Sequence, residues 1–233
     1  MKNNFKTQIT IILLLIASVA FAQEKETRDL DRFTEIRVSE GIEVIAKKGN
    51  SNSVELEVDR IDLDRILTEV RGDRLTIKLR RNSYSRRNNR RTVKAYITYT
   101  EEMEEIVATT GSEVIFEDMI KVKELRISTS TSGKVDVKAE VTYLDMSATT
   151  SGRVEVRGKA VEIEAKASTS GTIYAYDVEA EEAYAKANTG ADVRVNATDR
   201  LRASANTGGT VSYRGRPQID MKSNTGGKVR RAR

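Results

Sequence analysis

The stretch NTGGTV at residues 206–211 recurs with small changes at six other places in the chain. The other copies are TTGSEV at 109–114, STSGKV at 130–135, TTSGRV at 149–154, STSGTI at 168–173, NTGADV at 188–193 and NTGGKV at 224–229. The last residues of successive copies lie 21, 19, 19, 20, 18 and 18 positions apart. So regular a period indicates a repeat architecture, in which each unit is a small supersecondary element packed against its neighbours.

Each position of the repeated stretch is restricted to a few residue types. The third and fourth positions are Gly, Ser or Ala, and the sixth is Val or Ile. The second position is threonine in every copy: Thr110, Thr131, Thr150, Thr169, Thr189, Thr207 and Thr225. Alternating apolar stretches lie on both sides, such as LRIS from Leu125 and LRASA from Leu201. Small residues between alternating stretches are typical of a tight turn that joins two half-buried strands.

The repeat predicts an all-β fold, a parallel β-helix or β-solenoid with seven coils of 18–21 residues. Coils stack about 4.8 Å apart, so seven of them would form a column roughly 34 Å long. Inward Ala and Val side chains predict a narrow core, which would account for an aromatic content of only 5%. A sandwich of antiparallel hairpins is the competing architecture, but it would not need identical corners at a fixed period.

Residues 23–105 lack the repeat and predict a β-rich head. Strand-like runs lie at 33–38, 42–47, 53–58, 74–79 and 93–99. The intervening segment IDLDRILTEV at 61–70 predicts a short helix or turn. No linker rich in Pro, Gly or Ser separates this head from the repeats at 106–233. We therefore expect head and repeats to form one continuous domain with a shared core.

The first 22 residues have the three parts of a secretory signal peptide. Lys2 and Lys6 supply a positive start, residues 9–17 read ITIILLLIA, and Ala20-Phe21-Ala22 is a small-residue cleavage pattern. The apolar run is shorter than the roughly 20 residues of a membrane span, which argues against the alternative of an anchor. No later segment is apolar enough to span a bilayer. We therefore expect an exported protein of the periplasm or the cell surface.

The composition excludes several kinds of site. The chain has no His, Cys or Trp. Catalysis by a Ser-His-Asp or Cys-His set is impossible without an imidazole or a thiol. Zinc, haem and iron–sulfur sites normally need the same ligands, and a disulfide cannot form. We therefore expect no catalytic residues, no cofactor and no metal.

Positive charge is concentrated in two segments. The segment KLRRNSYSRRNNRR at 78–91 holds no acid and carries Lys78, Arg80, Arg81, Arg86, Arg87, Arg90 and Arg91. The tail carries Lys228, Arg230, Arg231 and Arg233. Without Lys2 and Lys6 the net charge of +5 falls to +3, so these eleven residues leave −8 for the rest. At the tail, charge on the last strand would discourage end-to-end pairing of solenoids.

The segment 78–91 predicts a basic hairpin tip that contacts an anionic partner. Its arginines and Tyr84 would suit a polysaccharide, a lipid head group or a nucleic acid, and the alternative is a solvated loop. Nucleic acid is not expected, because the protein is predicted to be exported and no aromatic interleaving accompanies the arginines. A cell-surface glycan or another anionic envelope component is the expected partner.

The order of the motifs resembles a known family. FTEIRVSEGIEVIAKKGNSNSVELEVD at 33–59 is followed by LTEVRGDRLTIKL at 67–79, VKAYITY at 93–99 and TTGSEV at 109–114. Over roughly residues 30–215 this resembles the putative auto-transporter adhesin, head GIN domain family of exported bacterial proteins. Gly41-Ile42-Glu43 stands where that family has Gly-Ile-Asn. The resemblance implies a β-helix-like fold, an exported location and an adhesin-like role.

Two further features have a functional and a structural interpretation. A flat threonine array could bind ice or a glycan lattice, but threonines at turns also bond nearby backbone and stack as ladders, which we favour. Asp136 and Glu155 fall at the same position of adjacent coils, as a catalytic carboxylate pair would.

The leading hypothesis is an exported, non-enzymatic binding protein. The alternatives are a carbohydrate-active enzyme using Asp136 and Glu155, and a purely structural envelope component.

Overall fold

The computed structural model describes residues 24–80 and 91–232, and almost all of its regular structure is β-strand. The head strands are β1 (Glu24–Asp29), β2 (Glu35–Val38), β3 (Glu43–Lys48), β4 (Ser53–Asp59), β5 (Ile66–Arg71), β6 (Arg74–Leu79) and β7 (Thr92–Tyr99). The repeats supply β8 (Glu105–Thr109), β9 (Glu113–Ser130), β10 (Lys134–Ala148), β11 (Arg153–Ala167), β12 (Thr172–Ala187), β13 (Asp192–Ala205), β14 (Thr210–Arg214), β15 (Gln218–Ser223) and β16 (Lys228–Arg231).

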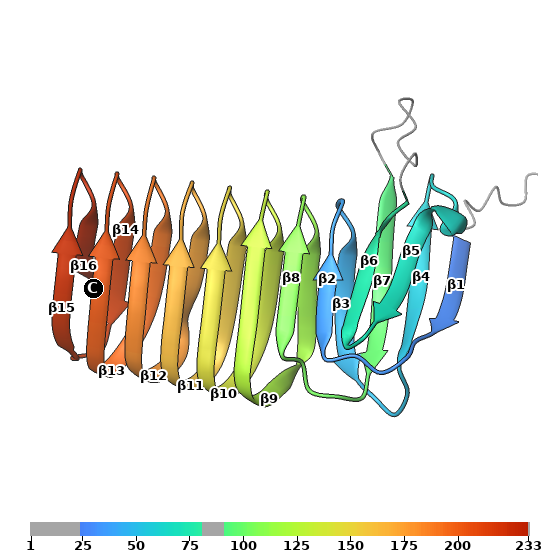
Figure 1. Cartoon of the computed structure of the whole chain (residues 1–233), viewed down its shortest axis with the longest axis horizontal. Helices are drawn as coiled ribbons and strands as arrows, with labels where there is room; N and C mark the ends of the chain where they lie inside the picture. The colour runs from blue at the N-terminus through green and yellow to red at the C-terminus, as the bar shows by residue number, and fades with distance from the viewer. Residues whose placement is uncertain (1–23, 81–90, 233) are drawn as a thin grey trace, which may run out of the picture.

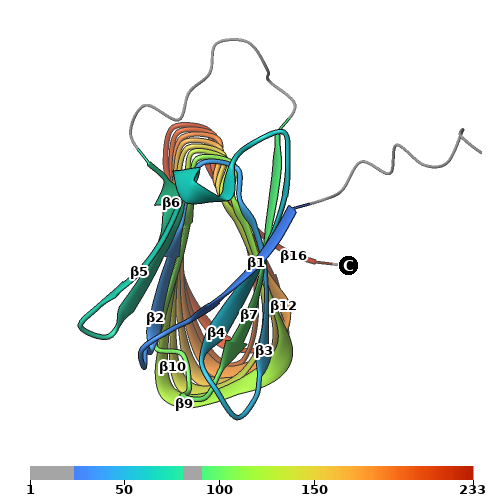
Figure 2. The same cartoon turned by 90° about the vertical axis from the view of Figure 1, so that its right-hand side faces the viewer.

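The strands form two facing layers that run the length of the molecule (Figures 1 and 2). The first layer has the order β1-β4-β7-β3-β9-β10-β11-β12-β13-β14-β16. The second layer joins β5, β6, β2 and β8 to the later halves of β9–β13 and then to β15. From β8 onward every pairing is parallel, and each coil pairs with the next. The predicted parallel β-solenoid is therefore confirmed.

Strands β9–β13 are long because each descends one layer, bends, and climbs the other (Figure 2). Burial alternates along them, so every second side chain enters the core. At the bend of β11, Gly158 has φ +132°, and a Cβ there would lie 2.0 Å from the carbonyl oxygen of Ala139. Only glycine fits this point, because a side chain would meet the backbone of the preceding coil.

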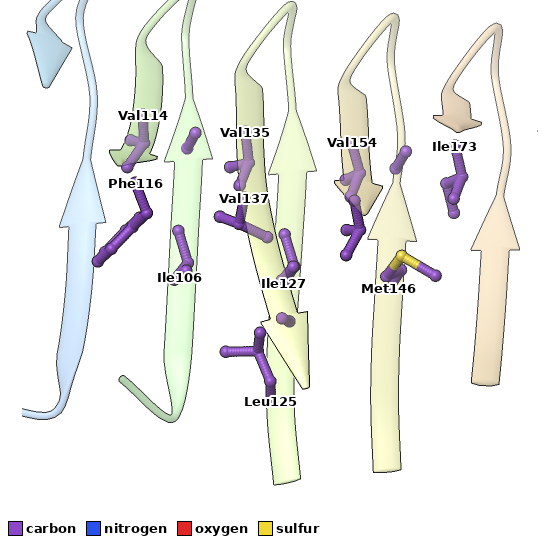
Figure 3. Packing of buried hydrophobic residues seen from close by; sticks show 14 of the residues in the cluster. Ile106, Val114, Phe116, Leu125, Ile127, Val135, Val137, Met146, Val154 and Ile173 are labelled. Atoms are coloured by element: carbon purple, nitrogen blue, oxygen red, sulfur yellow. The ribbon is translucent and has the colours of Figure 1, made fainter. Parts of the chain in front are cut away.

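The core is one continuous cluster of buried side chains from Phe33 to Tyr213. In the coils it is built mostly of Val, Ile, Leu, Met and Ala, with Phe116 and Tyr213, and these side chains project between the two layers (Figure 3). Valines such as Val135 and Val154 line the first layer, whereas alanines such as Ala185 and Ala203 predominate in the second layer of the later coils. These small side chains make the narrow core that the composition indicates.

The head closes one end of the column with antiparallel pairs. Strand β4 pairs antiparallel with both β1 and β7, and β5 pairs antiparallel with β6. Within the segment 61–70, Leu63–Arg65 form a short 3-10 helix, but the prediction of helix or turn is wrong for residues 66–70, which belong to strand β5. They are a strand because Thr68 and Val70 pair with Ile77 and Leu75 in β6.

The opposite end of the column is open. Among the strands of residues 24–80 and 91–232, β15 pairs only with β13 and β16 only with β14, so both present an edge that no described strand covers. All six residues of β15 are exposed, including Ile219 at 38% and Met221 at 57%. Within the described residues, no helix is long and apolar enough to cross a membrane.

Candidate functional site

The repeated stretches form the turns along one edge of the column (Figure 1). In each turn the threonine has φ of 47–52° and the next residue has φ of 61–75°. Two consecutive residues with positive φ are the signature of a type I′ turn. The fourth residue closes it by donating its N–H to the carbonyl of the first, at 2.8–3.2 Å. Asn-Gly is the usual choice for such a turn, so a β-branched threonine in this conformation is unusual.

The turns are linked to one another through their backbones. The N–H after each of the first six threonines donates to the carbonyl of the next coil's threonine, for example from Gly111 to Thr131 at 2.9 Å. Asparagine side chains add a second ladder: Nδ2 of Asn206 donates to Oδ1 of Asn188 at 3.0 Å, and Asn224 to Asn206 at 3.2 Å. The seven threonine side chains themselves are exposed. A structural role for this ladder remains a prediction.

One further turn belongs to the same row although it lies in the head. Ser39–Ile42 joins β2 to β3, with φ of 68° at Glu40 and 76° at Gly41. The N–H of Gly41 donates to the carbonyl of Thr110 at 3.0 Å. Sequence reasoning missed this turn because glutamate stands at the threonine position. The alignment of SEGIEV at 39–44 with TTGSEV at 109–114 could have revealed it.

The basic segment lies in sequence between β6 of the second layer and β7 of the first layer. The prediction that it forms the tip of a β-hairpin is therefore wrong. Strand β6 pairs with β2 and β5, whereas β7 pairs with β3 and β4, so the strands on either side do not pair with each other. Lys78 and Arg80 are exposed and Arg91 is half-buried. Arg81, Arg86, Arg87 and Arg90 lie outside the described residues. Because β6 pairs with β2 and β7 pairs with β3, the end of β6 and the start of β7 lie at the edge of the column where the turn at 39–42 joins β2 to β3.

Asp136 and Glu155 are in-register partners on adjacent strands, as predicted. Arg157 lies between them: its Nη2 is 2.6 Å from Oδ1 of Asp136, and its Nη1 is 2.9 Å from Oε1 of Glu155. The two carboxylates raise the pKa of Arg157, the bond to Asp136 being the largest cause. One guanidinium is bound by both carboxylates, which does not suit a carboxylate that must gain or lose a proton.

A second carboxylate pair, which sequence reasoning missed, lies on the outer face of the second layer. Asp145 pairs in register with Glu164, and the hydroxyl of Tyr143 donates to Oε2 of Glu164 at 2.6 Å. Burial and the charge of Glu164 raise the pKa of Asp145. Bonds from Lys166 and Tyr143 lower the pKa of Glu164. Opposite pKa shifts in two neighbouring carboxyl groups can separate a general acid from a general base. This pair, however, lies on a sheet face and not in a cleft. No group of three or more acids that could hold a metal ion is found in the described parts of the chain.

Known structures share the fold over most of the chain. A protein described as a putative adhesin from Parabacteroides merdae has a TM-score of 0.74 at 20% identity, covering 90% of this chain and 96% of that one. A putative adhesin from Bacteroides fragilis matches with 0.74 at 17%, covering 90% and 97%. A protein described as a putative lipid binding protein from Parabacteroides distasonis matches with 0.69 at 22%, again covering 90% and 97%. At these identities the likeness establishes the fold alone.

The sequence family described as "putative auto-transporter adhesin, head GIN domain" matches residues 32–217. No protein with a curated description matches the chain. The family match covers the head from just before Phe33 and the coils up to the loop before β15. With most of the chain matched and the coil architecture in place, this protein belongs to the head GIN domain family of auto-transporter adhesin-like proteins.

Proposed function

We propose that this protein is an exported, non-enzymatic binding protein of the bacterial cell envelope, which contacts an anionic component such as a surface glycan through the basic segment 78–91. Membership of a family described as adhesin-like supports a binding role. The predicted signal peptide, which lies outside the described residues, supports export.

The observation that carries the proposal is a run of positive charge without an acid, since the segment 78–91 carries seven basic residues and no Asp or Glu. On the sheet faces, by contrast, many basic residues are paired with acids on the same or neighbouring strands, as Arg157 is with Asp136 and Arg200 with Glu182 at 3.3 Å. At the start of the basic segment, Lys78 and Arg80 are exposed and take part in none of the ion pairs of the described residues. An unneutralised run of positive charge attracts anions over a distance of about 10 Å at moderate salt.

The position of the segment also suits contact with a large surface. Its flanking strands β6 and β7 bring it to the edge of the column that carries the turns, beside the turn at 39–42. A rigid column would hold such a segment out toward a glycan layer.

Retention on a heparin column, used as an anionic glycan, tests the proposal. The combined change of Arg81, Arg86, Arg87 and Arg90 to Gln should lower the NaCl concentration needed for elution by about half, because salt screens exposed charge pairs. A control that changes Arg71, Arg126, Arg200 and Arg202 to Gln has the same net charge and should elute much later than the segment variant. If both variants elute together, net charge alone causes retention and the assignment to the segment fails.

The enzymatic alternative makes a different demand. A carbohydrate-active enzyme would cleave members of a polysaccharide panel and lose that activity in Asp136→Asn or, on the second layer, in Asp145→Asn. Cleavage that disappears in either variant would replace the binding proposal. A purely structural envelope component would neither cleave the polysaccharides nor be retained on the column.

A further inference from the structure

An open hollow lies at the outer face of the first layer, near the open end of the column. It has a volume of about 520 Å³ and is lined by Tyr176, Arg194, Ser212, Arg230, Arg231 and Ala232. These residues come from β12, β13, β14, β16 and the residue that follows β16. Strands β6 and β7, which flank the basic segment 78–91 in sequence, lie in the head at the opposite end of the column (Figure 1).

The parallel register of the coils builds this hollow from one outward-facing column of side chains. Tyr174 pairs with Arg194, Arg194 with Ser212, and Ser212 with Arg230. Tyr176 follows Tyr174 by two residues in β12, with the buried Ala175 between them, so the two tyrosines point to the same outer face. This places a second tyrosine beside the arginines of the column.

Two tyrosine–arginine stacks hold the walls in place. The guanidinium carbons of Arg153 and Arg194 lie 4.3 and 4.6 Å from the centroid of the Tyr174 ring, one in the preceding coil and one in the following coil. The guanidinium of Arg214 lies 4.3 Å from the centroid of Tyr176. Stacking of this type orients a guanidinium without consuming its in-plane N–H donors.

Positive charge exceeds negative charge inside the hollow. Arg194 is bound by Asp192, with Nη2 to Oδ2 at 2.9 Å. The Nε of Arg230 donates to Oγ of Ser212 at 3.2 Å, and Ser212 is only 3% exposed. Neither Arg230 nor Arg231 forms an ion pair with an acid among residues 24–80 and 91–232. In mid-column, by contrast, Arg157 is bound by two carboxylates.

We propose that this hollow binds the carboxylate of an acidic sugar residue, such as a uronic acid within a surface glycan. Asp192 binds Nε and Nη2 of Arg194, and Ser212 binds Nε of Arg230. The remaining donors, Nη1 of Arg194 and both Nη groups of Arg230, suit a carboxylate, and the ring of Tyr176 offers a flat surface for the C–H groups of a sugar. The hollow opens onto the long outer face of the first layer, so neighbouring sugar units of a chain have room. This inference rests on the proposed binding role and adds the class of ligand. The hollow itself contains no residue of the basic segment.

The lining favours a sugar over a lipid head group. A lipid would need an apolar bed beside the anion site for its acyl chains. The large apolar side chains exposed in the described residues are Met119, Val161, Ile219 and Met221, and none of them lines the hollow. The residues that do line it are an aromatic hydroxyl, a serine, an alanine and three arginines.

The test is calorimetric titration of the chain from residue 23 with tri-galacturonic acid. Arg230→Gln and Arg194→Gln should each weaken binding about tenfold, since each removes a charge-assisted contact. Arg202→Gln removes the same charge from the second layer, near the same end, and should change the affinity by less than about twofold. Thermal melting verifies that all three variants are folded. Unchanged affinity in Arg230→Gln and Arg194→Gln, or equal loss in Arg202→Gln, would overturn the proposal.

Two further arms identify what is recognised. The methyl-esterified trimer lacks the carboxylates and should not bind detectably. Inorganic phosphate should bind far more weakly than the trimer, and Tyr176→Ala should weaken only the trimer. Phosphate that binds as tightly as the trimer would show a general anion site and overturn the sugar assignment. The Arg81, Arg86, Arg87 and Arg90 variant should keep its affinity for the trimer, so failure of this inference and failure of the proposed function give different results.

Discussion

The head and the later coils build the same two-layered column in different ways. In the head, the layers contain strands that are far apart in sequence, and the fully buried side chains are large: Phe33, Ile36, Leu56, Ile66, Leu75, Ile77, Ile97 and Tyr99. In the coils from β10 to β14, each strand pairs with its own counterpart in the next coil, and Val and Ala fill most of the core. The head ends in antiparallel pairs, whereas the last coil ends in open edges.

This difference determines which segments of the chain each side chain contacts in the head and in the coils. In the coils, a side chain's neighbours across the strands are the equivalent residues one repeat away, so contacts are repeated and nearest-neighbour in character. In the head, Arg74 of β6 reaches Glu35 of β2 at 2.7 Å and Glu105 of β8 at 3.0 Å, and so ties the head to the first repeat. Damage in the head should therefore cost more than equivalent damage in a coil.

Truncation of core side chains gives the largest effect and tests that contrast directly. Phe33 is 1% exposed and Val195 is 0% exposed. Phe33→Ala should lower the free energy of unfolding by about 3–5 kcal/mol, and Val195→Ala by about 1–2 kcal/mol, because the removed volume and cavity differ. Urea denaturation followed by circular dichroism measures both. Equal losses in the free energy of unfolding would mean that the coils of small residues tolerate the removal of a core side chain no better than the head does.

A smaller effect follows from the stacking of equivalent residues, which can place like charges together. Asp145 and Glu164 are such partners, with pKa values raised and lowered respectively. A raised pKa in the fold means that Asp145 destabilises the fold once pH exceeds its unfolded pKa of about 3.9. Asp145→Asn should therefore stabilise the protein by up to about 1 kcal/mol at pH 7 and have little effect at pH 3.

Glu164→Gln should have the opposite sign. The stability that Glu164 contributes is present above its unfolded pKa and is lost as pH falls through its folded pKa. The substitution should cost about 0.5–1 kcal/mol at pH 7, since it removes the ion pair with Lys166 and weakens the bond from Tyr143. Thermal melts of both variants at pH 3, 5 and 7 compare the two signs. Stabilisation by both substitutions would show that repulsion between the two carboxylates outweighs their separate partners.

The same contrast explains which parts of the structure could be predicted from the sequence. The coils were predictable because their signals are local and periodic: a turn every 18–21 residues, alternating burial, and a column in which Asp136 faces Glu155. The turn at Ser39–Ile42 was not, because β4 to β7 separate it in sequence from the turn at Thr110 to which Gly41 bonds, which breaks the 18–21 residue period. Only the likeness of SEGIEV at 39–44 to TTGSEV at 109–114 carries that information.

The candidate sites divide in the same way. The column Tyr174, Arg194, Ser212 and Arg230 continues the position that Asp136 and Glu155 occupy in earlier coils, so its register follows from the repeat. The hollow does not follow from the register alone, because Tyr176, Arg231 and Ala232, which lie outside this column, also line it. The separation of β6 from β7 likewise required the long-range pairing of the head, and without it the basic segment resembled a hairpin tip.

The smallest effect is expected at the open end, where a matched pair of methionines lies in one inward column. Met146 is 0% exposed, and the column runs through Ala165, Ala185 and Ala203 to Met221, which is 57% exposed. Met221→Ala should change the free energy of unfolding by less than about 0.5 kcal/mol, against about 2–5 kcal/mol for Met146→Ala. Denaturation at two protein concentrations measures both. A large, concentration-dependent loss of stability in Met221→Ala would mean that another copy covers the open edge in solution. Only burial against a partner could make this exposed side chain contribute as much to the free energy of unfolding as a core residue does.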